Sequence, residues 1–436
     1  MPNGFTNPEE LHTTGDLLLD SLIVNTSSGA QFDLLPFVEN IDIFEDLYAN
    51  AISGAITLVE SANLIQNIPL LGQETVDISF KTAGSLTKLQ YRVSVYKISE
   101  RIQTTDRGLL YKLHFTSVEF LRNFTNKFSK AMTGTPSELV DKIFRLYLKT
   151  PGGQNLNKIE ASSPSMKMVV PFWEPLKTIN WLGDRTQSAV NANQAGFLFF
   201  QTIRNGYYFV SLAGLLSSAP VIGYTAYPKG FRPPTDIVGN RDVVKEFTNA
   251  YSYKIDSSCD RLAQITTGTF GSTTVAYDPV FRAFSSKVYS YKNSFQSAPH
   301  LNQNPILPAI ETLSNGALST LHRRTRHSFA FDGILDNTRS PDYTSARNSI
   351  IKQLQDTIIR VSLPGDSRRQ AGDVVYLEVP SNQAIAPDDD WIDRRLTGNY
   401  LITAIHHNIT KINYSMDLEV AKDSFVRPYP TIKTIG

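Results

Sequence analysis

The chain has 436 residues, a formal net charge of +1 and 41% apolar residues, so it can build sizeable cores, and roughly two to four domains are expected. The near-neutral balance gives no support for a nucleic acid or an anionic membrane as partner. Only 19% of the residues are charged, whereas 24 are Phe and 19 are Tyr. This composition is typical of a chain that buries surface against other chains, and equally of a plain β-rich protein.

The single cysteine, Cys259, excludes an intrachain disulfide and is compatible with a reducing compartment. Residues 1–15 are polar and lack the basic and apolar regions of a signal peptide. No apolar run approaches the roughly 20 residues that a membrane helix needs. We therefore expect a protein that is soluble when made, is not exported by a cleavable signal and has no membrane partner.

Residues 1–121 are predicted to form a first β-barrel. Turn residues separate runs rich in β-branched and aromatic side chains, and six strands at this spacing favour a small barrel or sandwich. The expected strands are 17–25, 32–43, 51–59, 75–81, 89–99 and 110–120. One short helix is expected at 61–67, where Pro69 ends it.

Residues 122–240 predict an α+β domain followed by a connector. The run Thr-Pro-Ser-Glu at 135–138 is a capping box with proline at the first helical position, and the helix should continue through Tyr147. A second helix is expected from 175 towards 190. Asn205-Gly206 lies between two aromatic-rich runs and predicts a β-hairpin. Residues 220–240 are rich in Gly and Pro and predict the connector.

The rest of the chain predicts a second, discontinuous β-barrel. Its first part is 241–276, with strand-like pieces at 243–253 and 261–270. Residues 277–354 are an insertion without a clear pattern until a helix at 344–355. Residues 355–436 supply the closing strands and a C-terminal tail.

A weak internal repeat organises these regions. The stretch 398–424 contains a Tyr-led strand at 400–405 and a second strand at 414–420, in which apolar and polar residues alternate. An echo occurs at 91–98 and 111–117. Each copy follows a glycine turn and one further strand, at Gly72 in the first copy and Gly372 in the second. This order favours an internal duplication, with two unrelated hairpins as the alternative.

Motifs for catalysis are absent from the sequence: it has no phosphate-binding loop with lysine, no His-Glu-x-x-His and no Gly-x-Ser-x-Gly. Cys259 has no histidine nearby in sequence, so an ordinary free cysteine is expected. His406 and His407 are neighbours in a predicted strand and should point to opposite faces, which disfavours a shared metal ion. We therefore predict no catalytic residue, no cofactor and no metal site.

Two charged runs and one apolar pair stand out. Three aspartates at 388–390 could attract a hard cation, but they lack a spaced ligand loop and favour a solvated turn. The run His-Arg-Arg-Thr-Arg-His at 322–327 could touch phosphate, but without interleaved aromatics it favours a solvated or salt-bridged surface. Trp391 and Ile392 either plug the end of a barrel or anchor a partner, since tryptophan is favoured at binding hot spots.

The order of these modules suggests a family. Both strand-rich modules share a glycine turn, a strand and two Tyr-led strands. The second carries Leu-Pro-Gly-Asp at 363–366, Ala-Gly-Asp-Val-Val at 371–375 and Gly-Asn-Tyr-Leu-Ile-Thr at 398–403, with His407 and Tyr414. This arrangement resembles the baseplate central hub protein of contractile-tailed (T-even-type) bacteriophages and is similar to the hub part of type VI secretion spike proteins. The resemblance covers 17–425, has no single diagnostic motif and leaves 277–342 without a counterpart.

The resemblance implies a mainly β fold with α+β elements: two tail-tube-like antiparallel β-barrels, an intervening α+β domain and an irregular insertion. It implies a homotrimer whose six barrels surround a channel. One face would seat the trimeric central spike protein, and the other would seed the tail-tube protein or a tube-initiator ring, with baseplate wedge components as further partners. DNA would cross the channel without specific binding. Such a protein belongs to the virion tail, assembles in the host bacterial cytoplasm and is not an enzyme.

Two other functions remain open at this point. A peptidoglycan- or glycan-cleaving tail enzyme would need a pair of carboxylates about 5–10 Å apart in a cleft. A peripheral receptor-binding baseplate protein would bind glycans through exposed aromatic residues and would lack the duplication. Turnover of purified cell wall distinguishes the first of these from a structural role, and superposition of the two strand-rich modules distinguishes the second.

Overall fold

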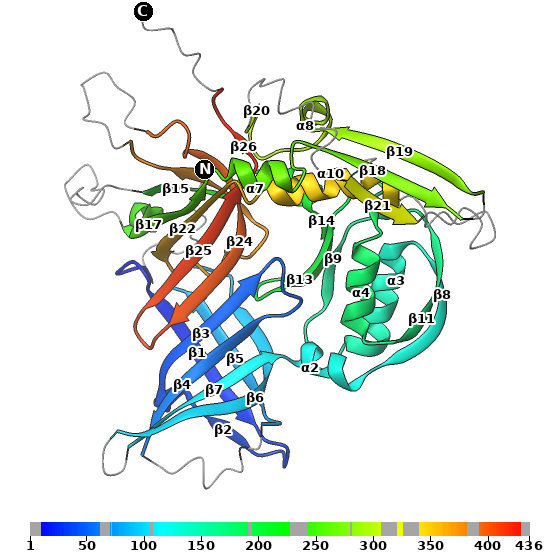
Figure 1. Cartoon of the computed structure of the whole chain (residues 1–436). Coiled ribbons are helices and arrows are strands. Elements are labelled where there is room, and N and C mark those ends of the chain that lie inside the picture. Colours follow the sequence, from blue (N-terminus) through cyan, green and yellow to red (C-terminus); the bar gives the residue numbers. More distant parts are fainter. Residues whose placement is uncertain are drawn as a thin grey trace, which may run out of the picture.

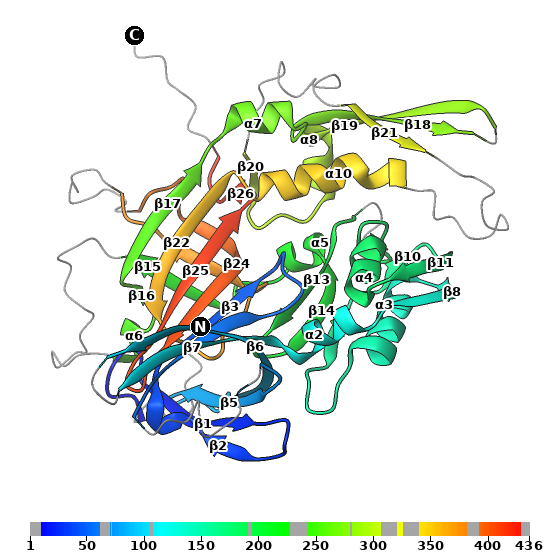
Figure 2. The same ribbon diagram turned by 60° about the horizontal axis from the view of Figure 1, so that its bottom comes forward.

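The computed structural model describes residues 10–61, 70, 72–104, 108–190, 194–226, 243–279, 281–306, 321–325, 340–381 and 392–428. Within these residues the chain is mainly β, with one sheet of fourteen strands and five sheets of two or three strands. Helices gather on one side of the large sheet (Figures 1 and 2). The predicted class, mainly β with α+β elements, is confirmed.

The first half of the large sheet is an antiparallel array in the order β2-β1-β5-β6-β7-β4-β3. Alternation along these strands buries one face, so that Ile56, Leu113 and Phe115 are fully buried. The strands are β1 (Leu17–Asn25), β2 (Gln31–Asp33), β3 (Val38–Asp46), β4 (Ser53–Glu60), β5 (Thr75–Thr82), β6 (Leu89–Gln103) and β7 (Leu109–Ser117).

The strand expected at 32–43 is divided in the structure. β2 ends at Asp33, and the 3-10 helix η2 (Leu35–Phe37) precedes β3. Pro36 lies within η2, and proline cannot donate a ladder hydrogen bond, which explains the break. The helix expected at 61–67 lies outside the described residues.

The second half of the large sheet follows the order β15-β23-β24-β25-β22-β17. β16 pairs with β15, the first strand of this order, and only Tyr251 separates β16 from β17, the last strand. The segment 249–258 therefore pairs with β15 through β16 and with β22 through β17. The strands are β15 (Ile222–Ala226), β16 (Asn249–Ala250), β17 (Ser252–Ser258), β22 (Thr357–Pro364), β23 (Val374–Glu378), β24 (Gly398–Ile409) and β25 (Tyr414–Lys422).

β24 joins the two halves because it is long enough to have three partners. Its start pairs with β23, and the remainder pairs with β25 on one edge and β3 on the other, with Ala404 opposite Asp46. One hydrophobic cluster therefore extends through both halves. It includes Ile41 and Ile56 from the first half and Ile359 and Ile402 from the second.

The α+β unit lies beside the large sheet (Figure 1). Its helices and strands are α2 (Val118–Thr125), β8 (Phe128–Gly134), α3 (Pro136–Ile143), the π-helical η3 (Phe144–Leu148), β9 (Leu156–Ile159), β10 (Ser162–Ser163), β11 (Met166–Trp173), α4 (Pro175–Gly183), β12 (Gln187–Ser188), β13 (Phe197–Thr202), β14 (Gly206–Ser211) and α5 (Leu212–Leu216). A separate hydrophobic cluster that includes Val140, Ile179 and Phe209 holds it together.

Local signals in this unit were informative. Thr135 and Glu138 form the predicted capping box at the start of α3. The predicted hairpin joins β13 to β14, and Gly206 has a φ of 75°, which favours glycine. The helix expected to run towards 190 ends at Gly183 instead. A Cβ there would lie 3.1 Å from the carbonyl oxygen of Phe197, so the glycine also permits close packing on β13.

The region between β17 and β22 is more ordered than the sequence predicted. It contains α7 (Arg261–Thr266), β18 (Gly271–Asp278), β19 (Ala283–Ser290), α8 (Tyr291–Ser294), η4 (Phe295–Ser297), β20 (Asn304–Pro305), β21 (Leu321–Thr325) and α10 (Ser340–Gln353). α6 (Val243–Glu246) precedes it, and β26 (Ser424–Phe425) pairs with β20. We call residues 259–356 the insertion.

Three expectations for this part of the chain were wrong. The strand expected at 261–270 is α7, because the Asp260 side chain caps the helix by accepting from the Ala263 N–H. β18 pairs with β19 and β21, not with the large sheet. β15 lies in the large sheet, although its residues fell in the predicted connector. Long-range pairing decides the last two cases, and no local pattern reports it.

Candidate interface and buried junction

Both residues of the histidine pair contact neighbouring side chains. As predicted from strand alternation, His406 and His407 lie on opposite faces: 29% of the His406 side chain is exposed and none of the His407 side chain is. His407 Nδ1 lies 2.7 Å from the Tyr414 hydroxyl. His406 Nε2 lies 2.8 Å from Asp42 Oδ1, and its ring stacks on Phe44.

The other candidates for chemistry do not form a site. Within the described part of the chain, no three His, Cys, Asp or Glu side chains cluster as metal ligands would. Cys259 is exposed, directly after β17. β21 consists of Leu321 and the first four residues of the basic run, 322–325. The aspartates at 388–390 lie outside the described residues. No helix among the described residues has the length and apolar content to cross a membrane.

A buried polar network joins the two halves of the sheet to the α+β unit. Its centre is Glu45 on β3, which is 1% exposed. One carboxylate oxygen accepts from the Ile203 N–H and the other from the Ala371 N–H, both at 2.8 Å. These two donors belong to the α+β unit and to the loop before β23, so Glu45 connects three parts of the molecule through charge-assisted hydrogen bonds.

The loop between β22 and β23 supplies further members of this network. Asp366 accepts from Arg368 Nε at 2.8 Å and Arg369 Nε at 3.3 Å. Burial alone would raise the pKa of Asp366, but Arg369 and Arg368 outweigh it and hold this pKa below its usual range. Burial raises the pKa of Asp373 to about 6, because Arg369 and Arg204 compensate it only in part.

Gln370 attaches the same loop to the β13–β14 hairpin. Its Oε1 accepts from Thr202 and Asn205, and its Nε2 donates to the Tyr208 hydroxyl at 3.1 Å. Arg204 also donates to the Arg368 carbonyl at 2.8 Å. Sequence analysis missed this junction, although a dense run of polar residues between two buried strands was a visible signal. A buried network of this kind favours one arrangement of the units.

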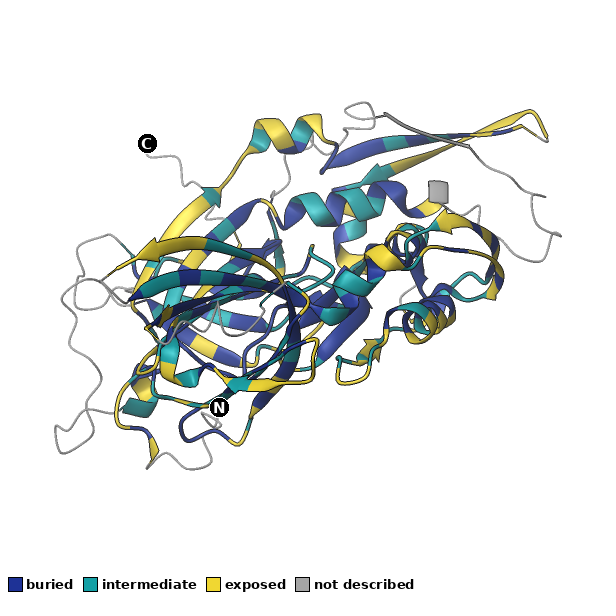
Figure 3. Ribbon diagram, turned by 90° about the horizontal axis from the view of Figure 1, so that it is seen from below, coloured by how far each residue is buried: buried dark blue, intermediate teal, exposed yellow. Residues whose placement is uncertain are grey.

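The outer end of the insertion exposes several large apolar side chains. The β18–β19 hairpin projects from the body of the molecule, and its outer part is exposed (Figures 2 and 3). Phe284 is 75% exposed, Val288 59% and Phe281 58%. The opposite face of β18 packs on α10, where Thr274 Oγ1 and Ser345 Oγ lie 2.8 Å apart. Projecting apolar strands of this kind usually mark contact with another chain.

The predicted partner-contact pair is only partly described. Ile392 is half-buried and forms a bridge with Pro380 at the base of the connection between β23 and β24. The next residue, Asp393, donates its N–H to the Val379 carbonyl at 2.7 Å. Trp391 lies outside the described residues. A role for Trp391 and Ile392 in partner contact therefore stays a prediction.

Comparison with known proteins identifies the class of fold. No protein-family model and no curated protein sequence matches the chain. Among solved structures, a tail protein from Neisseria meningitidis has a TM-score of 0.50 at 10% identity, covering 92% of this chain and 96% of its own. The 43 kDa tail protein of prophage MuSo2 from Shewanella oneidensis has a TM-score of 0.52 at 8% identity, covering 93% of this chain and 98% of its own.

At these identities the likeness establishes the fold alone. The chain has the fold of phage-type tail proteins across nearly its whole length. The resemblance that the sequence suggested is confirmed at this level. The function of the chain has to be argued from its own geometry.

Proposed function

We propose that the chain is a structural component of a phage tail baseplate and forms its central hub. In this proposal three copies close a ring that joins the threefold central spike to the sixfold tail tube and encloses the channel for DNA ejection. The fold of tail proteins supports the class of function. The choice of the hub rests on the repeated strand order within the large sheet.

The repeat supports the hub because it supplies six similar units from three chains. β3, β4, β5, β6 and β7 in the first half correspond in chain order to β17, β22, β23, β24 and β25 in the second. The pairings β3·β4, β4·β7, β5·β6 and β6·β7 recur as β17·β22, β22·β25, β23·β24 and β24·β25, all antiparallel. A cyclic trimer of such a chain presents near-equivalent surfaces six times.

Each half would form one tube-like β-barrel in this assembly. In the second half, the segment 249–258 pairs with β15 and with β22, so the strand order leads back to its beginning. In the first half, β3 turns its second edge to β24. Pairing all edges within the chain or with neighbours would protect them from aggregation.

The proposed partners follow from the ring. The central spike trimer would bind one face, and the tail-tube protein or a tube-initiator ring the other, with wedge components outside. DNA would pass without specific binding, in line with the net charge of +1. The chain would act in the virion after assembly in the host cytoplasm, without enzymatic activity. Trp391 and Ile392 would contact a partner at one face.

The decisive experiment is the mass of the purified protein, measured by light scattering after size exclusion with and without the spike protein. We expect three times the 48.6 kDa of one chain, alone or once the spike is added, and a ring with a central hole in electron micrographs. A stable monomer that ignores the spike contradicts the hub and favours a peripheral tail protein. Release of fragments from purified cell wall, lost on heat denaturation, would instead reveal a cleaving enzyme.

A further inference from the structure

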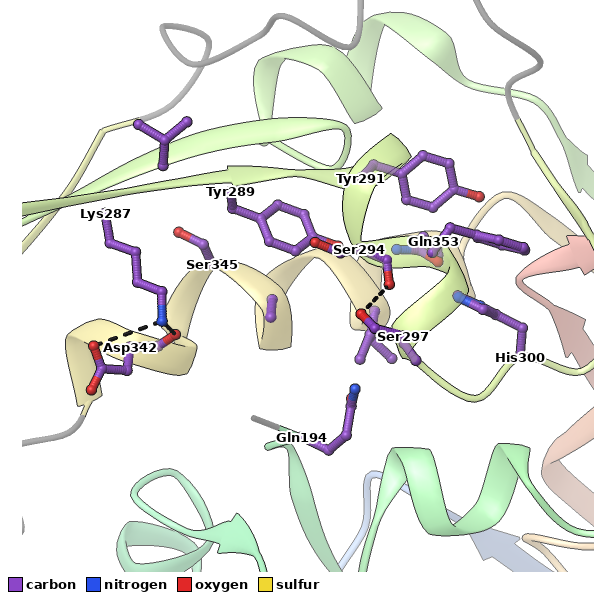
Figure 4. A pocket seen from close by; sticks show the side chains of 15 residues that line it. Gln194, Lys287, Tyr289, Tyr291, Ser294, Ser297, His300, Asp342, Ser345 and Gln353 are labelled. Atoms are coloured by element: carbon purple, nitrogen blue, oxygen red, sulfur yellow. Dashed lines mark hydrogen bonds and ion pairs between the residues drawn. The ribbon is translucent and has the colours of Figure 1, made fainter. Parts of the chain in front are cut away.

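A cavity with both polar and apolar lining residues lies where the insertion meets the α+β unit. Its volume is about 200 Å³ (Figure 4). Tyr289 and Tyr291 line it from the end of β19 and the start of α8, Ser345 from α10, and Gln194 from the segment before β13. None of these residues belongs to the buried junction, and Tyr289 lies at the end of the β18–β19 hairpin next to α8. The cavity is therefore distinct from the junction and lies at the base of the hairpin.

Three buried polar atoms of its lining residues have no partner. They are Nε2 of His300, Oε1 of Gln194 and Oε1 of Gln353. The His300 side chain is 6% exposed, Gln194 is 7% exposed and Gln353 is 1% exposed. Figure 4 shows the His300 and Gln194 side chains directed toward Ser297. A buried acceptor or donor without a partner costs free energy, so such atoms in one wall indicate a group that satisfies them.

The orientation of His300 is fixed by its surroundings. Its Nδ1 lies 2.6 Å from Oδ2 of the buried Asp423, and its ring stacks on Phe295 at 3.8 Å between centroids. Because Asp423 holds Nδ1, Nε2 is the ring atom left without a partner. The amide oxygens of Gln194 and Gln353 are acceptors. The wall therefore calls for a ligand that donates hydrogen bonds.

The remaining lining specifies a neutral ligand with several hydroxyl groups. Ser294, Ser297 and Ser345 add hydroxyls, next to the aromatic rings of Tyr289 and Phe295. The charged lining residues Lys287 and Asp342 pair with each other at 3.7 Å and are each about half exposed. Among the described lining residues no unpaired charge favours an ion. An apolar ligand would leave these buried polar atoms unpaired.

We propose that this cavity binds one sugar residue, whose hydroxyl groups donate to Gln194 Oε1 and form a hydrogen bond with His300 Nε2. The volume suits a single ring, with little room for a longer chain inside. The sugar is either a free monosaccharide or the terminal unit of a glycan. Neither the trimer nor the hub is required for this site, because all its residues come from one chain.

The test is a titration of the full-length protein with three probes: D-glucose, N-acetyl-D-glucosamine and the linear trimer of N-acetyl-D-glucosamine. Binding is measured by ligand-observed NMR. We expect saturable binding of at least one probe, with a Kd on the order of 1 mM for so small a ligand. Similar Kd values for the monosaccharide and the trimer identify a terminal unit as sufficient. Binding of the monosaccharides alone identifies a free sugar as the ligand.

Gln194→Leu removes one unpaired acceptor and should weaken binding by at least about tenfold while preserving or raising Tm. Ala346→Leu, on the cavity side of α10, fills the space without removing a hydrogen-bonding group and should abolish binding. Gln154→Leu is the matched control, because Gln154 Oε1 is also buried without a partner but lies away from the cavity. Absence of saturable binding for all three probes, or equal binding by wild type, Gln194→Leu and Ala346→Leu, overturns the proposal.

Discussion

The two halves of the large sheet share their strand order but differ most in one connection. β3 and β4 are joined by residues 47–52, whereas β17 and β22 are joined by the insertion. Both connections contact the α+β unit: Asn50 donates to Asn180 Oδ1 at 3.0 Å, and Arg347 pairs with Asp184. The same end of a hairpin therefore tolerates a short turn or an insertion of about a hundred residues, because loop closure costs little more for a longer loop.

A second difference lies at the outer edge of each repeat. β5 pairs with β1 in antiparallel orientation, whereas β23 pairs with β15 in parallel. The parallel neighbour follows from chain path, since β15 arrives from the α+β unit. The repeat is thus conserved in its five central strands and varies at its edge, where the rest of the chain enters.

The largest effect should come from breaking the link between the halves. Glu45→Ala leaves the Ile203 and Ala371 N–H groups unpaired in the interior, and we expect a loss of about 3–5 kcal/mol in the free energy of unfolding. Urea denaturation followed by tryptophan fluorescence measures it. Glu39→Ala, at an exposed position of the same strand, is the control. A loss no larger than that of the control would mean that the junction does not hold the halves together.

Two glycines test whether the halves are packed equally tightly. A Cβ at Gly365 would lie 2.0 Å from the Tyr414 ring, and one at Gly54 would lie 2.2 Å from the Asp42 carbonyl oxygen. Alanine at either position should cost about 2–3 kcal/mol through overpacking, measured as a shift in the denaturation midpoint. Gly223→Ala on β15 has no atom closer than 3.9 Å and should be neutral or slightly stabilising. If only Gly365→Ala or only Gly54→Ala is costly, only the half that contains that glycine is closely packed.

The acidic residue after each glycine turn should respond differently in the two halves. Asp373 has a folded pKa of about 6, above the ordinary value near 3.9, so its ionisation destabilises the fold as pH rises from about 4 to 6. Asp373→Asn should add about 2 kcal/mol at pH 8 and nothing at pH 4. Glu74→Gln should instead cost about 1 kcal/mol at pH 8, since Glu74 accepts from the Gly72 and Gln73 N–H groups. Equal effects at pH 8 would contradict this difference.

Local sequence signals predicted the parts of the fold that local physics determines. The capping box at Thr135, the hairpin at Gly206 and the alternation of β25 all report hydrogen bonds or burial within a few residues. The repeat was visible because each copy keeps its glycine turn and Tyr-led strand. Pairings between distant segments, such as β15 with β23, leave no comparable local mark.

The candidate sites were harder to predict than the fold. Glu45 lies in a strand whose acidic residues alternate with apolar ones, and its burial depends on backbone donors from 158 and 326 residues away. His300 gained a role only through Asp423, which lies 123 residues later. In contrast, the opposite orientation of His406 and His407 followed from strand geometry alone.

The smallest expected effect concerns His406, at the seam where β24 meets β3. Its hydrogen bond to Asp42 raises the His406 pKa above its ordinary value near 6.5, so the stabilisation is present below that pH and is lost as pH rises through the folded pKa. His406→Gln should cost about 0.5–1 kcal/mol at pH 6 and little at pH 9. Burial and then Lys97 lower the pKa of His114, so His114→Gln should show the opposite pH trend. Unfolding curves of both variants at pH 6 and pH 9 test this expectation. If the two variants show the same pH trend, the ion pair between His406 and Asp42 does not hold the seam.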